Sequence, residues 1–361
     1  MAVMSPLHLL DPARFDRPDV LKALAAASRQ LAEFKGVAYS IPNQGILINT
    51  LTLQEAKDSS AIESIVTTHD ELFRDFTSPD ETTNPRAKEV ARYRQALRVG
   101  FEAVAAHRLL STAHILRIQE ELEPSQTGFR KLPGTSLKDN FGKVVYEPPQ
   151  NSDEIVALMS DLERFVNDES LFRADPLVKM ALVHHQFESI HPFYDGNGRS
   201  GRIVCVLYLL KEGLLDAPIL YLSRHILRTK QEYYQRLQDV RDHGRWEDWV
   251  VYMLAAVEAT ARQGAATIHQ IGRALIDIKH QIREQHPRFY SQDLINHLFM
   301  HPYTKIDILQ ASLGVSRITA RNYLEVLTTD GILQKSRVGR SNFYINRRLF
   351  DILAGEEEAA R

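Results

Sequence analysis

Apolar residues recur at intervals of three and four along most of this chain. Such spacing places the apolar side chains on one face of a helix, where they can pack against a core. The pattern predicts helices over residues 87–110, 112–122, 153–167, 176–189, 201–212, 228–240 and 246–262. The chain is therefore expected to be mainly α-helical.

One stretch, residues 130–149, departs from the helical pattern. Two β-prone segments flank the turn residues Asp139 to Gly142, and Pro148 and Pro149 close the stretch. Turn residues between two extended segments are typical of a β-hairpin. The sequence therefore predicts one hairpin within the helical part.

The last fifth of the chain has a different order of elements. An apolar-periodic segment ends at Gly314, and Ser316 is a good N-cap for a second helix. Two extended segments around Gly339 follow. Two helices joined by a glycine turn and followed by a strand pair predict a winged helix-turn-helix.

Composition and charge limit the class of protein. The 361 residues are 44% hydrophobic and 25% charged, as in ordinary globular proteins, and the length favours two or three domains. A net charge of −2 argues against a broad attraction to nucleic acid or to an anionic membrane. The single cysteine, Cys205, excludes an intrachain disulfide, and no apolar run approaches the roughly 20 residues needed to span a bilayer. We expect a cytoplasmic protein without membrane contact.

Basic residues are locally in excess near the C-terminus. Residues 301–351 contain eight Lys or Arg against four Asp or Glu. Such a surplus is compatible with phosphate contacts, but equally with a solvated face or a dimerisation module. The candidate DNA contacts are Arg317, Arg321, Arg337 and Arg340.

The segment DGNGRSGR, residues 195–202, concentrates three glycines and two arginines between two predicted helices. Its backbone N–H groups would lie at the start of the second helix, which we expect near Gly201, and would form an anion site there. Arg199 and Arg202 add charged donors for phosphate oxygens. Asp195 would repel a phosphate unless it holds a Mg²⁺ ion that bridges phosphates.

A histidine stands at the mouth of this loop. His191 could accept a proton from an incoming hydroxyl, so the set describes a nucleotide-dependent group transfer. His185, Glu188 and His191 could instead be metal ligands. The H-E-x-x-H pattern of zincins is absent, however, which disfavours a zinc site.

The stretch HPFYDGNGRSGR, residues 191–202, matches in full the signature H-P-F-x-[DE]-G-N-G-R-x-x-R of the Fic (filamentation induced by cAMP) domain family. The resemblance extends over about residues 52–254, and a winged helix accompanies many members. It implies a helical Fic enzyme that transfers AMP from ATP to a protein hydroxyl (Tyr, Thr or Ser), on a partner or on itself, with release of pyrophosphate. ATP is then the substrate and Mg²⁺ the metal.

The resemblance also implies roles for single residues. His191 corresponds to the general base, Asp195 to the Mg²⁺ ligand, and Arg199 and Arg202 to contacts of the β- and γ-phosphates. The α-phosphate anion hole corresponds to Gly196, Asn197 and Gly198. The hairpin resembles the flap that aligns a target segment as an added strand, with Lys138, Gly142, Val144 and Val145 as docking residues. Tyr233 and Tyr234 resemble adenine-pocket residues, although aromatic residues on such a helix are more often core.

A second motif, DSSAIESIV at residues 58–66, resembles the inhibitory helix S/T-x-x-x-E-[G/N] of Fic proteins. Ser59 and Glu63 are spaced to share one face of a helix, which we expect at about 54–67. By the resemblance, Glu63 pairs with Arg202 and so takes up a ligand of the γ-phosphate. Ser64 departs from the usual Gly or Asn, and an ordinary helix with an exposed glutamate is the plainer alternative.

The expected organisation is an N-terminal helical region (1–110), a catalytic core (111–262), a connecting helical segment (263–298), a winged helix (299–354) and a tail (355–361). Two other activities stay open: removal of AMP from a modified target, and a DNA-binding regulator whose core senses nucleotide. A second copy of the chain, as in a homodimer, is a further candidate partner.

Overall fold

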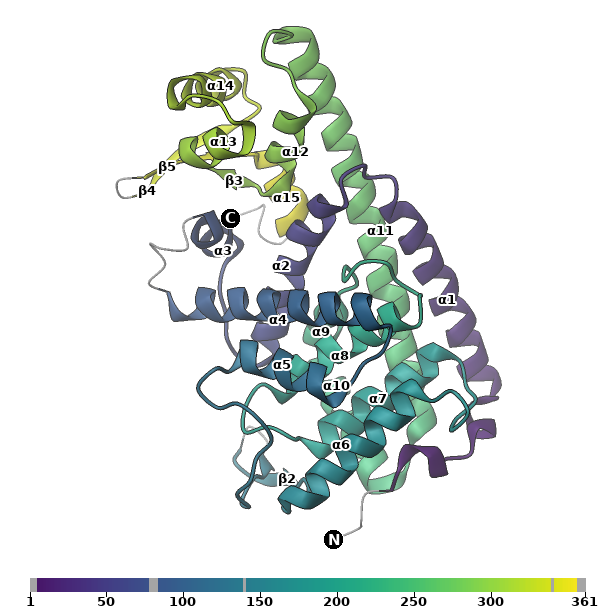
Figure 1. Ribbon diagram of the computed structural model, residues 1–361. Helices are drawn as coiled ribbons and strands as arrows, with labels where there is room; N and C mark the ends of the chain where they lie inside the picture. Colours follow the sequence, from purple (N-terminus) through teal and green to yellow (C-terminus); the bar gives the residue numbers. More distant parts are fainter. Residues whose placement is uncertain (1–4, 78–83, 139–140, 339–340, 356–361) are drawn as a thin grey trace. The chain divides into compact units, whose positions relative to one another are not determined.

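The computed structural model describes residues 5–77, 84–138, 141–338 and 341–355. Within these residues the chain is mainly helical and has two small antiparallel sheets (Figure 1), which confirms the predicted fold class. Two compact units are each assembled from segments distant in the sequence. Unit 1 comprises residues 1–35, 58–65 and 92–262, and unit 2 comprises residues 36–57, 66–91 and 263–361.

The elements follow one another in this order. Two short 3-10 turns, η1 (Leu7–Leu9) and η2 (Pro12–Phe15), precede α1 (Pro18–Ala38), α2 (Gln44–Ile62), α3 (His69–Thr77), α4 (Pro85–His107) and α5 (Thr112–Leu122). The hairpin strands β1 (Leu137–Lys138) and β2 (Val144–Tyr146) come next, followed by α6 (Ser152–Asn167), α7 (Pro176–Ile190), α8 (Asn197–Lys211), α9 (Leu222–Arg228), α10 (Lys230–His243) and α11 (Trp246–Gln285). The C-terminal elements are α12 (Gln292–Met300), β3 (Tyr303–Thr304), α13 (Ile306–Leu313), α14 (Arg317–Thr329), β4 (Gln334–Val338), β5 (Ser341–Ile345) and α15 (Arg347–Ala354).

Several helix boundaries differ from those expected. Helix α8 begins at Asn197 and not near Gly201, because only Gly196 adopts the left-handed conformation and the later glycines stay helical. The helix expected at 228–240 is preceded by a break at Thr229, whose φ of −117° and ψ of 31° are not helical. Helix α11 continues past residue 262, because buried apolar residues such as Ile271 and Ile278 maintain its stripe.

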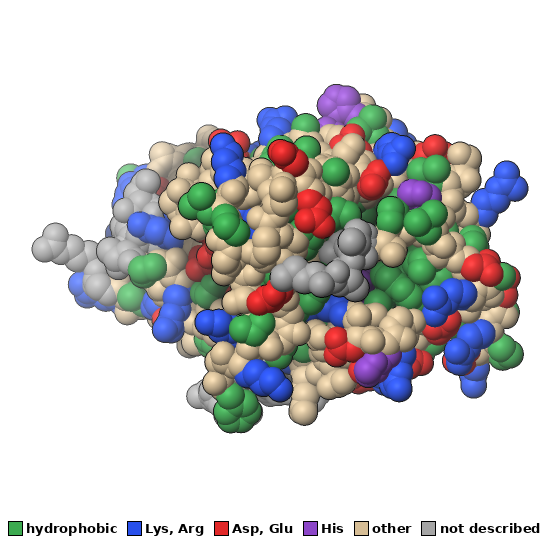
Figure 2. Space-filling view, turned by 90° about the horizontal axis from the view of Figure 1, so that it is seen from below, with side chains coloured by type: hydrophobic (Ala, Val, Ile, Leu, Met, Phe, Trp, Pro, Cys, Tyr) green, Lys and Arg blue, Asp and Glu red, His purple; other side chains and the backbone are tan. Residues whose placement is uncertain are grey.

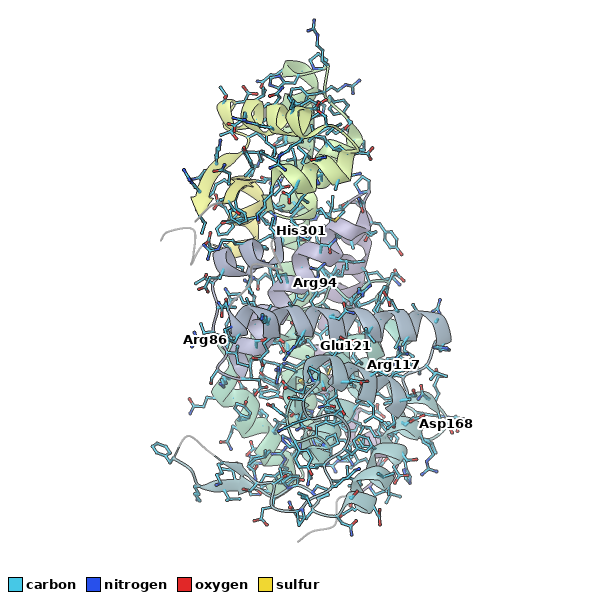
Figure 3. All side chains as sticks on the ribbon, turned by 60° about the vertical axis from the view of Figure 1, so that its left-hand side comes forward. Arg86, Arg94, Arg117, Glu121, Asp168 and His301 are labelled. Carbon is cyan, nitrogen blue, oxygen red and sulfur yellow. The ribbon has the colours of Figure 1, made fainter. Side chains whose placement is uncertain are left out.

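Helices α7 and α8 form the centre of unit 1. Every residue from Leu177 to Ile190 is buried, and α8 is buried almost as completely. Helix α7 packs against α6 and α8, and α8 also contacts α5. Helix α5 is amphipathic, with Ile118 buried and Arg117 exposed (Figure 3). This packing holds the end of α7 beside the beginning of α8.

The C-terminal elements of unit 2 have the expected order. Gly314 ends α13 with a φ of 64°, and the Ser316 hydroxyl caps α14 by accepting a hydrogen bond from the Thr319 N–H at 3.1 Å. The three strands are ordered β3-β5-β4, all antiparallel. Gly339 and Arg340, at the tip of the expected wing, lie outside the described residues.

The surface carries charges of both signs. On the face shown in Figure 2, Lys and Arg side chains are interspersed with Asp and Glu, in keeping with the net charge of −2. In the part of the chain that the structure describes, no helix combines the length and the apolar character needed to cross a bilayer.

Candidate active site

His191 stands at the C-terminal end of α7 in a strained backbone conformation. Its φ of 48° and ψ of 58° are left-handed, which costs a non-glycine residue roughly 1–2 kcal/mol. Pro192 follows it and cannot continue a helix. Strain of this kind is found where surrounding contacts fix a side chain for a task.

The surroundings of His191 keep its imidazole neutral. The pKa of His191 is lowered to about 4, chiefly by burial and then by the nearby guanidinium groups of Arg130 and Arg241. At pH 7 the ring is therefore unprotonated. An unprotonated imidazole can accept a proton from a hydroxyl, as a general base must.

The loop between the two helices is closed by the side chain of Asn197. Its Oδ1 accepts a hydrogen bond from the Phe193 N–H at 2.9 Å, and its Nδ2 donates to the Phe193 carbonyl at 2.8 Å. The amide thus both accepts from and donates to the loop backbone at Phe193. Its backbone N–H lies in the first turn of α8, where N–H groups lack intrahelical partners and can donate to an anion.

The start of α8 offers backbone N–H groups to an anion. Gly196 is the N-cap with a φ of 80°, and no side chain caps the first turn. The first N–H groups of a helix lack intrahelical partners and lie at the positive end of the helix dipole, so they favour an anion. The residues expected to bind the α-phosphate, Gly196, Asn197 and Gly198, come together here.

The three glycines of the loop serve different needs. Gly196 provides the left-handed turn. A Cβ on Gly198 would lie 2.3 Å from Glu63 Oε1, so this glycine makes room for the Glu63 carboxylate. A Cβ on Gly201 would lie 2.4 Å from Glu188 Oε1, so this glycine permits the close approach of α8 to α7.

Arg199 is buried beside an acidic residue that the sequence did not single out. Its side chain is 2% exposed, and its Nη2 donates to Glu123 Oε1 at 2.7 Å and lies 3.4 Å from Asp195 Oδ1. A buried guanidinium needs such a counter-charge. Glu123 directly follows α5 and belongs to no recognisable sequence motif. Its pairing with Arg199 therefore could not be predicted from the sequence and depends on the packing of α5 against α8.

Arg202, 1% exposed, is held by the end of α2. Its Nε donates to the Ser59 hydroxyl at 2.8 Å, and its Nη2 donates to the Ser59 carbonyl and to Glu63 Oε1, each at 3.0 Å. Burial acts to lower the pKa of Arg202, but the attraction of Glu63 raises it above its usual value. The expected pairing of Glu63 with Arg202 is thus present in the structure.

The helix that carries Ser59, α2, begins and ends earlier than the expected range of about 54–67. It ends one residue before Glu63 and does not extend to residue 67. The Ile65 N–H donates to the Ser60 carbonyl and the Ser64 N–H to the Ala61 carbonyl, each at 3.0 Å, which is the Schellman pattern. Ser64 has a φ of 69° in this turn. A left-handed residue is required there, which explains why Gly or Asn is usual in the motif.

Asp195 is suited to a cation at the mouth of the loop. Its side chain is 64% exposed, and its Oδ1 accepts a hydrogen bond from the Gly196 N–H at 2.6 Å. Among the described residues no three His, Cys, Asp or Glu side chains are grouped so as to hold a metal. One carboxylate beside a candidate anion site is compatible with Mg²⁺, which commonly takes one or two carboxylates and completes its shell with water and phosphates.

The other histidines on α7 are built into the core. His185 Nε2 lies 3.2 Å from the Leu237 carbonyl and His184 Nε2 lies 2.9 Å from the Tyr233 hydroxyl. Burial lowers the pKa of both histidines to about 3. Burial also raises the pKa of Glu188 to about 7.

The expected flap is a β-hairpin, with shorter strands than the stretch 130–149. Strands β1 and β2 pair with Leu137 opposite Tyr146 and Lys138 opposite Val144. Gly142 turns with a φ of 80°, and Val144 and Val145 are 43% and 41% exposed. The valines are therefore accessible to a partner strand. Residues 139–140 lie outside the described residues.

The two tyrosines of α10 have different surroundings. Tyr233 is 2% exposed and packs among the rings of His184, Trp249 and Tyr252. Tyr234 is 46% exposed. The structure therefore places Tyr233 in the core and leaves Tyr234 accessible to an adenine ring.

Three family models match consecutive parts of the chain. Residues 21–102 match the Fic/DOC family N-terminal model, residues 109–209 the Fic/DOC family model, and residues 275–349 the protein adenylyltransferase SoFic-like C-terminal domain. The first match contains Ser59 and Glu63, and the second contains the whole loop that follows His191.

Similar curated proteins match the chain over part of their length. Protein adenylyltransferase fic-1 of Caenorhabditis elegans is 30% identical over 115 residues, which are 32% of this chain and 21% of that protein. A probable protein adenylyltransferase of Aquifex aeolicus (strain VF5) is 30% identical over 207 residues, which are 54% of this chain and 57% of that protein. The matches thus span about a fifth to just over half of these relatives.

Solved structures share the fold. A Fic family protein from Desulfovibrio desulfuricans G20 superimposes with a TM-score of 0.60 at 21% identity, over 91% of this chain and 96% of that one. A part of Fic-1 from C. elegans superimposes with a TM-score of 0.54 at 21% identity, over 68% of this chain and 71% of that one.

Proposed function

The chain belongs to the Fic/DOC family, and from this premise we propose that it is a protein adenylyltransferase restrained by its own Glu63. It transfers AMP from ATP to the hydroxyl of a Tyr, Thr or Ser side chain on a protein target, its own chain included. The observation that carries the proposal is the left-handed His191 next to the uncapped start of α8, with Arg202 paired to Glu63.

The chemistry follows from these positions. An imidazole nitrogen of His191 takes the proton of the target hydroxyl while the hydroxyl oxygen bonds to the α-phosphorus of ATP. The bond from the α-phosphorus to the oxygen that bridges to the β-phosphate breaks, and pyrophosphate leaves with that electron pair. The N–H groups at the start of α8 stabilise the charge on the α-phosphate oxygens, because they are oriented before the reaction.

Mg²⁺, when held by Asp195, supplies charge neutralisation for the phosphates. In this proposal Arg202 binds the γ-phosphate of ATP. Its guanidinium already donates three hydrogen bonds to Ser59 and Glu63. Because Glu63 is 35% exposed, it can leave Arg202 without opening the core. ATP in the productive pose and Glu63 therefore compete for one guanidinium.

The experiment follows the transfer of label from α-³²P-ATP into protein. Purified wild type, Glu63→Gly, His191→Ala and the double variant are compared, with γ-³²P-ATP as a control that separates adenylylation from phosphorylation. We expect Glu63→Gly to raise labelling and His191→Ala to abolish it in both backgrounds. Labelling that survives His191→Ala would show that the assigned base is wrong.

A second direction of the reaction has one observation in its favour. The Glu63 carboxylate lies close to Gly198 in the first turn of α8, where it could orient a water toward a modified hydroxyl. Removal of AMP would then need Glu63, whereas transfer would be inhibited by it. Release of label from a modified target by wild type but not by Glu63→Gly would assign this direction.

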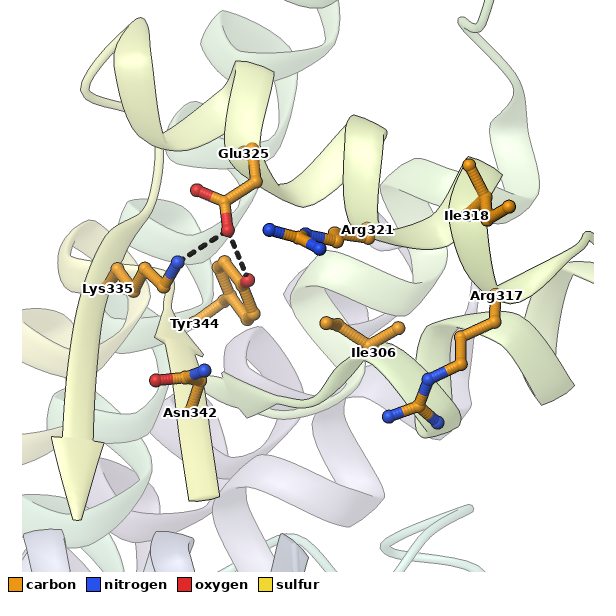
Figure 4. Close-up of a pocket in the computed structure, with 8 residues that line it drawn as sticks. All are labelled: Ile306, Arg317, Ile318, Arg321, Glu325, Lys335, Asn342 and Tyr344. Atoms are coloured by element: carbon orange, nitrogen blue, oxygen red, sulfur yellow. Dashed lines mark hydrogen bonds and ion pairs between the residues drawn. The ribbon is translucent and has the colours of Figure 1, made fainter. Parts of the chain in front are cut away.

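A second candidate function rests on a cavity of about 330 Å³ in unit 2 (Figure 4). Arg317 and Arg321 of α14 and Lys335 of β4 line it. Glu325 is the acidic side chain in the lining, and it pairs with Lys335. Three cations against one carboxylate suit contacts with the phosphates of duplex DNA. A helix-turn-helix places its second helix, here α14, in the major groove.

DNA binding of this kind must weaken as salt rises, because phosphate contacts release counterions. Fluorescence anisotropy of a labelled duplex at low and moderate salt tests it, with Arg317→Ala and Arg321→Ala as variants. Arg337, exposed on β4, provides a third position. Absence of binding at low salt would remove this candidate and leave the transferase proposal untouched.

A further inference from the structure

Arg130 lies at the base of the flap and is almost fully buried, at 1% exposed. Its Nε donates to the His191 carbonyl at 2.8 Å, and its Nη2 donates to the Ile190 carbonyl at 3.3 Å and to the Pro149 carbonyl. Its own backbone N–H donates to the Pro192 carbonyl at 2.9 Å. One side chain thus joins both ends of the flap to the residues around the catalytic base.

Two of these carbonyls, those of Ile190 and His191, stand at the C-terminal end of α7. The last carbonyls of a helix have no intrahelical donor, and buried carbonyls left unpaired are costly. A cation at the C-terminal end of α7 also interacts favourably with the helix dipole. The Arg130 guanidinium therefore stabilises the turn in which His191 holds its left-handed φ of 48°.

The residues after Arg130 strengthen the connection. The Lys131 and Leu132 N–H groups donate to the Tyr194 hydroxyl at 2.9 and 3.1 Å. Tyr194 belongs to the same loop as His191. The start of the flap is therefore held to the loop at three consecutive positions, of which only Arg130 contacts the His191 backbone.

Arg130 also acts on the His191 ring through its charge. After burial, Arg130 is the strongest influence that lowers the pKa of His191 to about 4. Arg241 of α10 acts in the same direction, and Glu63 acts against both. Loss of Arg130 would therefore raise the pKa of His191, whereas loss of a merely structural contact elsewhere on the surface would not.

We propose that Arg130 is a positioning residue that couples the flap to the catalytic base: the contact that fixes the hairpin also fixes the backbone and orientation of His191. A target segment aligned along the flap is thereby placed in register with the base. This inference rests on the proposed transferase function for its kinetic consequence, but not for its structural one.

The kinetic test uses the Glu63→Gly background, in which activity is unrestrained. Arg130→Met should lower kcat by about tenfold or more, because small misplacements of a catalytic group are costly, while KM for ATP changes by less than about twofold. Arg130→Lys should recover part of the loss, because an ammonium can serve some of the carbonyls. Arg164→Met, which removes an exposed arginine of α6, is the matched control.

The second test needs no activity. An NMR titration of the His191 ring, assigned with His191→Ala, should give a higher pKa in Arg130→Met than in wild type. Hydrogen exchange of the 137–146 backbone should be faster in the same variant. Tyr194→Phe removes the neighbouring anchor without removing the charge, so it should quicken exchange and leave the pKa of His191 unchanged.

The outcomes separate the two hypotheses. If Glu63→Gly shows no His191-dependent labelling while Arg130→Met still raises the pKa of His191 and loosens the hairpin, the transferase function fails and the coupling stands. If labelling is present but Arg130→Met leaves kcat, the pKa of His191 and hairpin exchange as in Arg164→Met, the coupling is overturned. Should Arg130→Met fail to fold, kcat and hairpin exchange of Arg130→Lys decide, because the lysine keeps the charge but not the three side-chain hydrogen bonds: values equal to those of Arg164→Met overturn the coupling.

Discussion

Arg202 Nη2 donates a hydrogen bond to Glu63 Oε1 across 3.0 Å, although the two residues are 139 positions apart in the sequence. Ser59, from the last turn of α2, accepts two more hydrogen bonds from the same guanidinium. The guanidinium is buried, and the carboxylate that pairs with it is partly exposed. In the proposed function, this pairing is the restraint that ATP must displace.

Ser59→Ala should release part of the restraint. It removes the acceptor of Arg202 Nε but keeps the Ser59 carbonyl, so labelling should rise about fivefold, equivalent to about 1 kcal/mol, and less than in Glu63→Gly. In Glu63→Gly the added Ser59→Ala change should have little effect, because the restrained state is already lost. Initial rates of label incorporation in this double-mutant cycle provide the measurement. Additive effects would place Ser59 outside the restraint.

Ser64→Gly should stabilise the protein and tighten the restraint. Ser64 has a φ of 69°, which glycine adopts without the steric cost that a side chain carries, so a gain of about 1 kcal/mol is expected. Urea unfolding measures the gain, and labelling should fall in parallel. Ser64→Ala keeps a Cβ at this position and is the control. Equal stability of the Gly and Ala variants would argue against strain at this turn.

The pH dependence of transfer should reflect the lowered pKa of His191. The base is active when neutral, so activity is present above its pKa and lost as the pH falls through about 4. We expect kcat/KM of Glu63→Gly to change little between pH 6 and 8, with no acid limb near the ordinary histidine value of about 6.5. Initial rates after short exposure to each pH test this. A midpoint near 6.5 would mean that His191 is solvated in the working enzyme.

Gly201→Ala should destabilise the protein without altering the N–H groups at the start of α8. The added methyl would lie 2.4 Å from Glu188 Oε1 and 3.1 Å from Phe187 Cδ1, in the contact of α8 with α7. Overpacking of this kind costs about 1–3 kcal/mol, measured by urea unfolding. Gly36→Ala on α1 is the matched control, because nothing lies within 4 Å of its added Cβ, and it should stabilise by about 0.5–1 kcal/mol. If Gly201→Ala leaves the free energy of unfolding unchanged, α7 and α8 can separate slightly to make room for the methyl group.

Much of the candidate site could be predicted from the sequence because its residues are close together along the chain. The residues from His191 to Arg202 are twelve consecutive positions, and the helices on both sides follow from apolar spacing. The helix boundaries were predicted less well, because they depend on the backbone angles of single residues. Of the three glycines after Asp195 only Gly196 is left-handed, so α8 begins earlier than expected. Ser64 is left-handed as well, so the helix that was expected to reach residue 67 ends at Ile62.

The sequence by itself determined the helical class, the flap hairpin, the C-terminal helix and strand pattern, and the chemistry of one loop. Only the tertiary structure decided which partners meet across helices: Glu123 with Arg199, 76 positions apart, and Arg130 with the His191 carbonyl, 61 positions apart. Periodicity states which face of a helix is buried, but not which residue of another element lies against it. The lowered pKa of His191 has the same origin, because burial and neighbouring charges exist only after packing.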